Sequence, residues 1–288
     1  MSAAQRTVLI TGCSIGGLGY GLAEAFKARG LRVFATARNP ARMQGLSEKG
    51  IETLTLDVLS GTSIEACVEQ ISHLTGGSLD ILVNNAGGGY NMPVSDIEVD
   101  EAKKLFDLNV WSYITVTQAF LPFLIKSKGM VINNTSVSSV EPTPHNSVYN
   151  ASKAAAAMFN DHMRIEFEPF GVKVIDLKTG CVHTKFHANH QGGTASLPSS
   201  SIYLPVKEET EKAMRNAFPD RSDPAEWART VVDDLLNPNP AAQIWRGVGA
   251  WKTWFVWTFF SNTWYDESWR RLVGLDLLRK RLSQRGRV

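Results

Sequence analysis

Short runs of apolar, often β-branched residues alternate with helix-length amphipathic segments along most of the chain. The runs are TVLIT, LRVFATA, IETLTLDV, LDILVNNAG, GMVINNTS and VKVIDLKTG. Strands that are apolar on both faces are typical of a parallel sheet with helices on both sides. With one last strand in the C-terminal third, the pattern predicts a seven-stranded, doubly wound α/β sheet.

Charge and cysteine content exclude several classes of protein. The 30 Lys and Arg and the 28 Asp and Glu are interspersed, so no basic stripe indicates a nucleic-acid partner. The three cysteines, Cys13, Cys67 and Cys181, match neither a zinc site nor a disulfide framework, which favours a reducing, cytoplasmic setting. We expect neither a secretory signal peptide nor a spanning helix, which needs roughly 20 apolar residues.

A glycine-rich segment, TGCSIGGLG from Thr11 to Gly19, follows the first apolar run and opens the first helical segment. Glycines at such a turn allow a pyrophosphate to approach the free N–H groups of a helix N-terminus. A turn that binds nothing is the alternative. Arg38 follows the second run, where an arginine favours the 2′-phosphate of NADP over the 2′-hydroxyl of NAD. Arg38 could also be a solvated surface charge.

Tyr149 and Lys153 lie one helical turn apart near the start of the segment SVYNASKAAAAMFNDHMRIEF. A free tyrosine has a pKa of about 10, and we expect the lysine to stabilise the phenolate and lower this pKa. Ser136 ends the run GMVINNTS, at the edge of the sheet where ligands of open α/β sheets bind. The three residues form a candidate proton-transfer site.

Five motifs in this order resemble the short-chain dehydrogenase/reductase family. They are the glycine turn, NNAG at residues 84–87, LNV around Asn109, Ser136, and YNASK at residues 149–153. The resemblance spans roughly residues 7–190 and is strongest for fungal reductases related to 1-acyldihydroxyacetone-phosphate reductase. It implies a Rossmann-type fold and a reaction between a carbonyl and an alcohol with a nicotinamide cofactor.

The resemblance also implies roles for individual residues. Tyr149 would donate a proton to the carbonyl oxygen, and Ser136 would hold that oxygen. Lys153 would bind the nicotinamide ribose and lower the Tyr149 pKa, while Asn109 would anchor a proton relay through water. The residues implied to bind NADP(H) are Gly12, Ser14, Gly17, Leu18, Gly19, Arg38, Asp57, Val58, Asn85, Ala86, Gly87, Asn109, Tyr149, Lys153, Val182 and Thr184.

Two departures from the family pattern bear on these roles. The glycine turn carries one extra residue, so either Gly16 or Gly17 could take the middle position. Thr179 and Gly180 replace the usual Pro-Gly pair, which removes the rigidity of proline before the loop predicted at residues 181–205. His183, His187 and His190 cluster in this loop and could suggest a metal, but they are interpreted as loop residues and no metal site is expected. His145 lies near Tyr149 in the sequence and could touch the substrate, but it is also interpreted as a loop residue.

The segment from Trp251 to Phe260, WKTWFVWTFF, is aromatic on nearly every side if it is helical, yet it is too short to span a bilayer. It could cover the substrate pocket, form a subunit contact or dip into a lipid interface. Each alternative favours a bulky, apolar substrate. The family resemblance also makes a homo-oligomer an expectation.

These features predict an NADPH-dependent reductase of a ketone or aldehyde on a bulky apolar substrate, either an acyl-dihydroxyacetone-phosphate-like lipid or a steroid-like molecule. The alternatives are a tailoring reductase, or a non-redox dehydratase or cyclase, of fungal secondary metabolism, and a non-catalytic NADP(H)-binding sensor. We expect a cytoplasmic protein, peripheral on the endoplasmic reticulum or lipid droplets if the tail binds lipid.

The predicted organisation is a single Rossmann-type domain over residues 1–288. Residues 7–190 would form the cofactor-binding and catalytic core. Residues 191–288 would supply a substrate loop, the last strand and the tryptophan-rich C-terminal cover.

Overall fold

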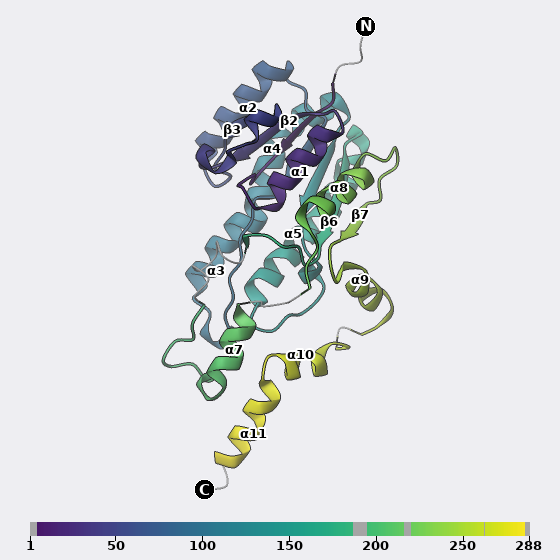
Figure 1. Cartoon of the computed structure of the whole chain (residues 1–288). Helices are drawn as coiled ribbons and strands as arrows, with labels where there is room; N and C mark the ends of the chain where they lie inside the picture. Colours follow the sequence, from purple (N-terminus) through teal and green to yellow (C-terminus); the bar gives the residue numbers. More distant parts are fainter. Residues whose placement is uncertain (1–4, 187–194, 216–219, 262, 286–288) are drawn as a thin grey trace.

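A parallel sheet of seven strands forms the centre of the chain in the computed structural model, which describes residues 5–186, 195–215, 220–261 and 263–285 (Figure 1). The strands are β1 (Thr7–Ile10), β2 (Arg32–Ala37), β3 (Glu52–Thr55), β4 (Ile81–Asn84), β5 (Met130–Asn134), β6 (Lys173–Thr179) and β7 (Gln243–Arg246). Their order is β3-β2-β1-β4-β5-β6-β7, and each neighbouring pair is parallel. The prediction of a doubly wound α/β sheet is confirmed.

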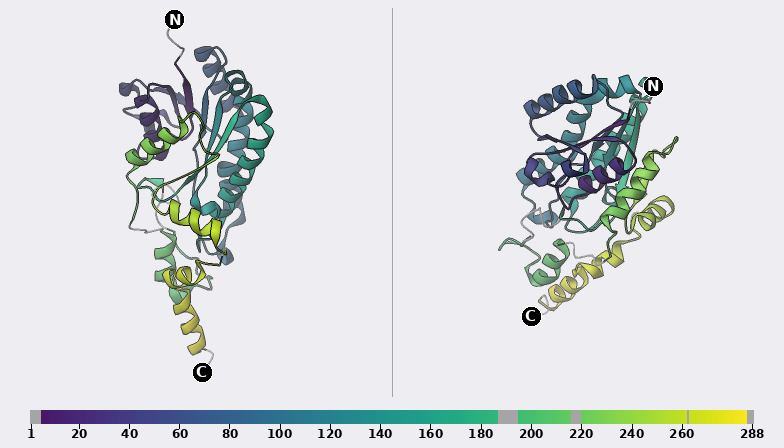
Figure 2. Two further views of the ribbon diagram at one scale, coloured as in Figure 1. Left: turned by 90° about the vertical axis from the view of Figure 1, so that its right-hand side faces the viewer. Right: turned by 45° about the horizontal axis from the view of Figure 1, so that its top comes forward.

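Helices cover both faces of this sheet. The helices α1 (Leu18–Ala28) and α8 (Pro224–Leu235) pack on one face (Figure 2). The other face carries α2 (Gly61–Thr75), α4 (Ser112–Ser127) and α5 (Ser147–Glu166). Successive side chains of a strand point to opposite faces, so Val8 and Ile10 pack under the first layer and Leu9 under the second.

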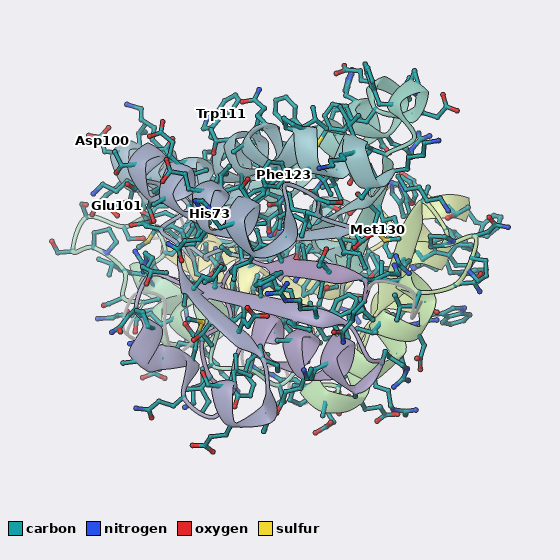
Figure 3. All side chains as sticks on the ribbon, turned by 90° about the horizontal axis from the view of Figure 1, so that it is seen from above. His73, Asp100, Glu101, Trp111, Phe123 and Met130 are labelled. Atoms are coloured by element: carbon teal, nitrogen blue, oxygen red, sulfur yellow. The ribbon has the colours of Figure 1, made fainter. Side chains whose placement is uncertain are left out.

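One continuous helix runs from Val99 to Ser127, close to the helical stretch predicted at about 99–126. It consists of α3 (Val99–Phe106), a π-helical turn at Asp107–Trp111 and α4. By length and composition it could cross a bilayer, contrary to our expectation from the sequence, but α4 packs on the sheet as a core helix. Seen from above, Asp100, Glu101 and Trp111 lie at the rim of the molecule (Figure 3).

The C-terminal part of the chain lies beyond the carboxyl edge of the sheet, at the end of the molecule opposite the N-terminus (Figure 1). It contains α7 (Lys207–Met214), α9 (Ala250–Phe259), α10 (Asp266–Leu272) and α11 (Leu275–Arg285). Short 3₁₀ turns connect other elements at Pro40–Met43, Ser47–Lys49, Val94–Asp96, Val137–Ser139, Glu168–Phe170 and Leu204–Val206. This arrangement brings distant segments of the chain to the sheet edge where the site lies.

Candidate active site

A cavity of about 900 Å³ lies at the carboxyl edge of the sheet. The predicted site residues that line it are Gly12, Ser14, Gly17, Leu18, Arg38, Asp57, Val58, Asn85, Ala86, Gly87, Ser136, Tyr149, Lys153, Val182 and Thr184. Gly19 and Asn109 are buried next to it and are not among its lining residues. The structure therefore brings nearly all of the sequence-predicted residues to one place.

The glycine turn gives backbone access at one end of the cavity. Gly12 has φ +75°, and a Cβ atom there would lie 2.8 Å from the Cα of Ala86. A Cβ atom on Gly19 would lie 2.6 Å from the carbonyl oxygen of Gly12, so only glycine lets α1 pack this closely. Gly17 is the N-cap of α1 and lines the cavity, whereas Gly16 faces the side chain of Lys185. Of the two glycines, Gly17 is therefore the one that lines the cavity, and its role as the middle glycine stays a prediction.

The start of α1 suits an anionic group. Among the residues that the structure describes, no side chain caps this helix, and its first turn contains no acidic residue. Uncapped N–H groups and the positive end of the helix dipole together favour a phosphate. The residues present therefore fit the pyrophosphate of a dinucleotide cofactor.

Two arginines border the cavity next to this turn. Arg38 directly follows β2, and Arg42 belongs to the 3₁₀ turn after it. In the described part of the chain, neither guanidinium has a carboxylate within ion-pair distance. Sequence reasoning missed Arg42, because nothing in the pattern distinguishes it from a solvated arginine. Asp57 lies two residues beyond the end of β3, and its carboxylate accepts from the Leu59 N–H at 3.1 Å.

Ser136, just after the end of β5, and Tyr149, near the start of α5, both line the cavity. The Oγ of Ser136 accepts from the Ser138 N–H at 3.1 Å and donates to the Thr179 carbonyl at 3.4 Å. Burial raises the pKa of Tyr149 to about 12, and a hydrogen bond with Ser136 opposes this rise. Tyr149 is therefore protonated at neutral pH and can serve as a proton donor.

Lys153 is buried one turn further along α5. Its Nζ donates to the Asn134 carbonyl at 2.8 Å and to the Tyr113 hydroxyl at 3.2 Å, and lies 6.0 Å from the centre of the Tyr149 ring. Burial lowers the pKa of Lys153 to about 8, and the charge of Asp176 opposes this fall. Burial is the largest influence on the Tyr149 pKa, which is raised overall. The lowering of this pKa by Lys153 stays a prediction.

Asn109 lies on the π-helical turn, a feature often found at functional sites. Its Oδ1 accepts from the Gly88 N–H at 2.8 Å, and its Nδ2 donates to the Gly88 carbonyl and to the Ser152 Oγ. These bonds tie the long helix to α5 and to the segment after β4. The water relay at Asn109 stays a prediction.

A buried ion pair on β6 supports the turn that Ser136 begins. The Nζ of Lys178 lies 2.7 Å from the Oδ2 of Asp176, and the two side chains are 2% and 0% exposed. The same Nζ donates to the Oγ of Ser139 at 2.9 Å. Ser139 ends the 3₁₀ turn that Ser136 caps, so β6 helps to fix the position of Ser136.

The cavity continues past Tyr149 to Glu141, Thr143 and Asn146 before α5, and to Lys252, Thr253, Tyr265 and Trp269 in the C-terminal part. The last four belong to the part of the chain predicted to cover the substrate pocket, whereas sequence reasoning missed the three residues before α5. The Thr253 hydroxyl donates to Glu141 at 2.6 Å. Burial raises the pKa of Glu141, while the Thr253 bond and the charge of Lys252 oppose this rise. The Oδ1 of Asn146 is buried with no hydrogen-bond partner in the described residues. This end of the cavity, which we call the substrate end, therefore offers hydrogen-bond acceptors to a ligand.

The cysteines and histidines take separate places. Cys13 and Cys67 are buried, whereas Cys181 lines the cavity. His145 packs against Tyr203 and is absent from the lining residues, and His183 is exposed. His187 and His190 lie outside the described residues. Within the described ranges, no three His, Cys, Asp or Glu side chains are grouped as metal ligands would be.

Comparisons with known proteins match the sequence and the fold of this chain to those of dehydrogenases. A sequence model described as short chain dehydrogenase matches residues 6–193. A short-chain dehydrogenase/reductase of Pestalotiopsis microspora is 49% identical, with 98% of this chain and 99% of the relative covered. An NADPH-dependent 1-acyldihydroxyacetone phosphate reductase of Schizosaccharomyces pombe is 38% identical, with 85% and 86% covered. A short-chain dehydrogenase structure from Streptomyces avermitilis has a TM-score of 0.75 and 26% identity, covering 99% and 97%.

Proposed function

The chain belongs to the short-chain dehydrogenase/reductase family, whose members are oxidoreductases that act on CH–OH groups, and we propose that it is an NADPH-dependent reductase of a ketone or aldehyde on a bulky, largely apolar substrate. One observation carries the proposal. A single cavity extends from Arg38 and Arg42, past Ser136 and Tyr149, to the wall formed by α9 and α10. The name of the Schizosaccharomyces pombe relative supports NADPH, and an acyl-dihydroxyacetone-phosphate-like lipid is the first substrate to test.

In this proposal the chain's own residues carry out the proton transfer. When bound, the cofactor supplies the hydride that reaches the carbonyl carbon. The Tyr149 hydroxyl gives its proton to the carbonyl oxygen, and the Ser136 hydroxyl, held by the backbone of Ser138, orients that oxygen. The products are the alcohol, the oxidised cofactor and a Tyr149 phenolate, which the charged Lys153 beneath the ring stabilises until a proton returns.

The rate of reduction is expected to fall as pH rises through about 8. The pKa of Lys153 is lowered to about 8, so its charge is complete below this pH and is lost above it. Without that charge the developing phenolate loses its stabilisation. The profile of kcat/KM for NADPH against pH reports groups of the free enzyme and measures this limb. Lys153→Arg should move the limb upward, and a flat wild-type profile across this range would contradict the assignment.

The proposal is tested by NADPH oxidation against a panel of carbonyl compounds. The panel contains acyl-dihydroxyacetone phosphate, steroid ketones and polyketide-like ketones. Turnover of the acyl phosphate supports the lipid reductase, and turnover of only the polyketide-like ketones favours a tailoring reductase. NADPH binding without turnover of any compound would favour the non-catalytic sensor or a non-redox reaction.

Glu141→Ala is expected to raise the KM for the carbonyl substrate by about 10- to 100-fold, while the Kd for NADPH stays unchanged. The substitution removes a charged acceptor and leaves the Thr253 hydroxyl without its partner, and such bonds contribute about 1.5–3 kcal/mol. Glu141→Gln keeps the shape and an acceptor oxygen, so its KM should lie between those of the wild type and Glu141→Ala. Equal KM values in all three proteins would show that Glu141 does not contact the substrate.

A further inference from the structure

Six aromatic side chains form a continuous cluster on the surface at α9 and the segment that follows it. We call Trp251, Trp254, Phe255, Phe259, Phe260 and Trp264 the aromatic face. The ring centres of Trp251 and Phe255 are 5.8 Å apart, and those of Phe260 and Trp264 are 4.2 Å apart. Trp251 is 70% exposed, Phe259 62% and Trp264 56%. The rings therefore pack on one another and leave much of their surface in water.

The aromatic face is larger than a monomeric soluble protein usually leaves open. Each aromatic side chain has roughly 150–250 Å² to bury, so six partly exposed rings present several hundred Å². Contiguous apolar patches of that size mark sites of protein or membrane binding. The opposite side of α9 is occupied, because Ala250, Thr253 and Val256 are buried against the body of the protein. The aromatic face is thus the outer side of a helix whose inner side is packed.

Positive charge accompanies the aromatic face along the chain. Residues 250–288 contain eight Lys and Arg and three Asp and Glu, whereas the formal net charge of the whole chain is only +2. The C-terminal segment is therefore basic, and the preceding 249 residues carry a net negative charge. In α10, Arg270 and Arg271 pair with exposed carboxylates, while Arg279 and Lys280 of α11 are exposed with no ion pair in the described part of the chain.

We propose that the aromatic face binds a lipid surface with anionic headgroups. Tryptophan prefers the boundary between headgroups and acyl chains, and nearby lysines and arginines are attracted to anionic lipid. A second copy of the chain is a poorer occupant, because a symmetric contact would bring two basic segments together. The aromatic rings supply apolar area, and α11, with four Lys and Arg and one Asp, supplies the complementary charge.

Lipid binding would also place the substrate end of the cavity close to the membrane. Lys252 and Thr253 line the cavity from the same helix that carries the aromatic face. A carbonyl compound dissolved in the membrane would then have a short path to Tyr149. The binding itself does not depend on the redox function, so the two proposals can fail separately.

Vesicle flotation of the full chain tests the proposal, with phosphatidylcholine vesicles that contain or lack phosphatidylserine. We expect binding to the mixed vesicles, and at least about tenfold weaker partitioning for the pair Trp251→Ser and Phe259→Ser, because apolar area leaves the lipid. The pair Arg279→Glu and Lys280→Glu should also weaken binding about tenfold, and only to the vesicles with phosphatidylserine.

The matched control is the pair Trp111→Ser and Phe170→Ser, which removes an exposed tryptophan and an exposed phenylalanine that do not belong to the aromatic face. This variant should bind vesicles like the wild type, and NADPH binding by all variants verifies that they fold. The proposal is overturned if the wild-type protein floats with neither type of vesicle. Unchanged flotation of the Trp251 and Phe259 pair, with a smaller mass by light scattering, would assign the aromatic face to a contact between copies instead.

Discussion

Tyr149→Phe is expected to lower kcat for carbonyl reduction by about 10²- to 10⁴-fold, the contribution of a general acid. The substitution removes the Tyr149 hydroxyl, which is hydrogen-bonded to Ser136, and phenylalanine has no proton to give. The ring remains, so its contact with Phe186 at 5.8 Å and the shape of the cavity should persist. Steady-state NADPH oxidation measures the loss of kcat, and fluorescence titration should give an unchanged Kd for NADPH.

Tyr20→Phe is the matched control for this result. The Tyr20 hydroxyl donates to the Gln44 carbonyl at 3.2 Å, and the residue is absent from the cavity lining. We expect its kcat to stay at the wild-type value, with at most about 0.5–1.5 kcal/mol lost from the free energy of unfolding. Turnover by Tyr149→Phe close to that of the control would mean that another group donates the proton.

Arg38→Asp is expected to shift the cofactor preference from NADPH toward NADH. The ratio of kcat/KM for NADPH to that for NADH should fall by about 10²- to 10⁴-fold. The change removes charge-assisted bonds to a 2′-phosphate, each worth about 1.5–3 kcal/mol, and adds a like charge close to it. An aspartate after β2 can instead accept from the 2′-hydroxyl of NADH. The kinetic constants for the two cofactors, measured with the same carbonyl substrate, give this ratio.

Two further variants make the cofactor result specific. Arg42→Ala should lower the ratio by a smaller factor, because Arg38 would remain at the cavity. Arg229→Asp changes the net charge as much as Arg38→Asp does, but it lies on the exposed side of α8 and should leave the ratio unchanged. If Arg38→Asp behaves like Arg229→Asp, Arg38 is only a solvated charge.

The fold followed from local patterns, because its strands are short apolar runs and its helices have clear periodicity. Six strands were located within a few residues. Five of them, all except β3, are almost completely buried and cannot shift register without exposing apolar side chains. The third strand ends earlier than its sequence run, at Thr55, because β3 is an edge strand and only partly buried. The π-helical turn at Asn109 could not be foreseen, since a single extra residue in a helix leaves the apolar periodicity almost unchanged.

The site was predictable only where its residues belong to motifs. Tyr149 and Lys153 lie on α5, and Ser136 lies two residues after the end of β5, so the topology alone brings them together. The substrate end depends on contacts across long stretches of chain. The bond between Glu141 and Thr253 joins residues 112 positions apart, and no local pattern marks either of them. Likewise, the sequence shows a lysine near a tyrosine but not the burial that sets both of their pKa values.

The ion pair of Asp176 and Lys178 restricts the order in which this chain can change over evolutionary time. Both groups are almost completely enclosed, so replacing either one alone strands the other charge and costs about 3–5 kcal/mol. That loss approaches the whole stability margin of many domains. Neutral drift at these two positions therefore requires paired substitutions or a prior stabilising change elsewhere. Lys178 also donates a hydrogen bond to Ser139. A descendant protein that loses the ion pair would therefore need another contact to hold the turn that begins at Ser136.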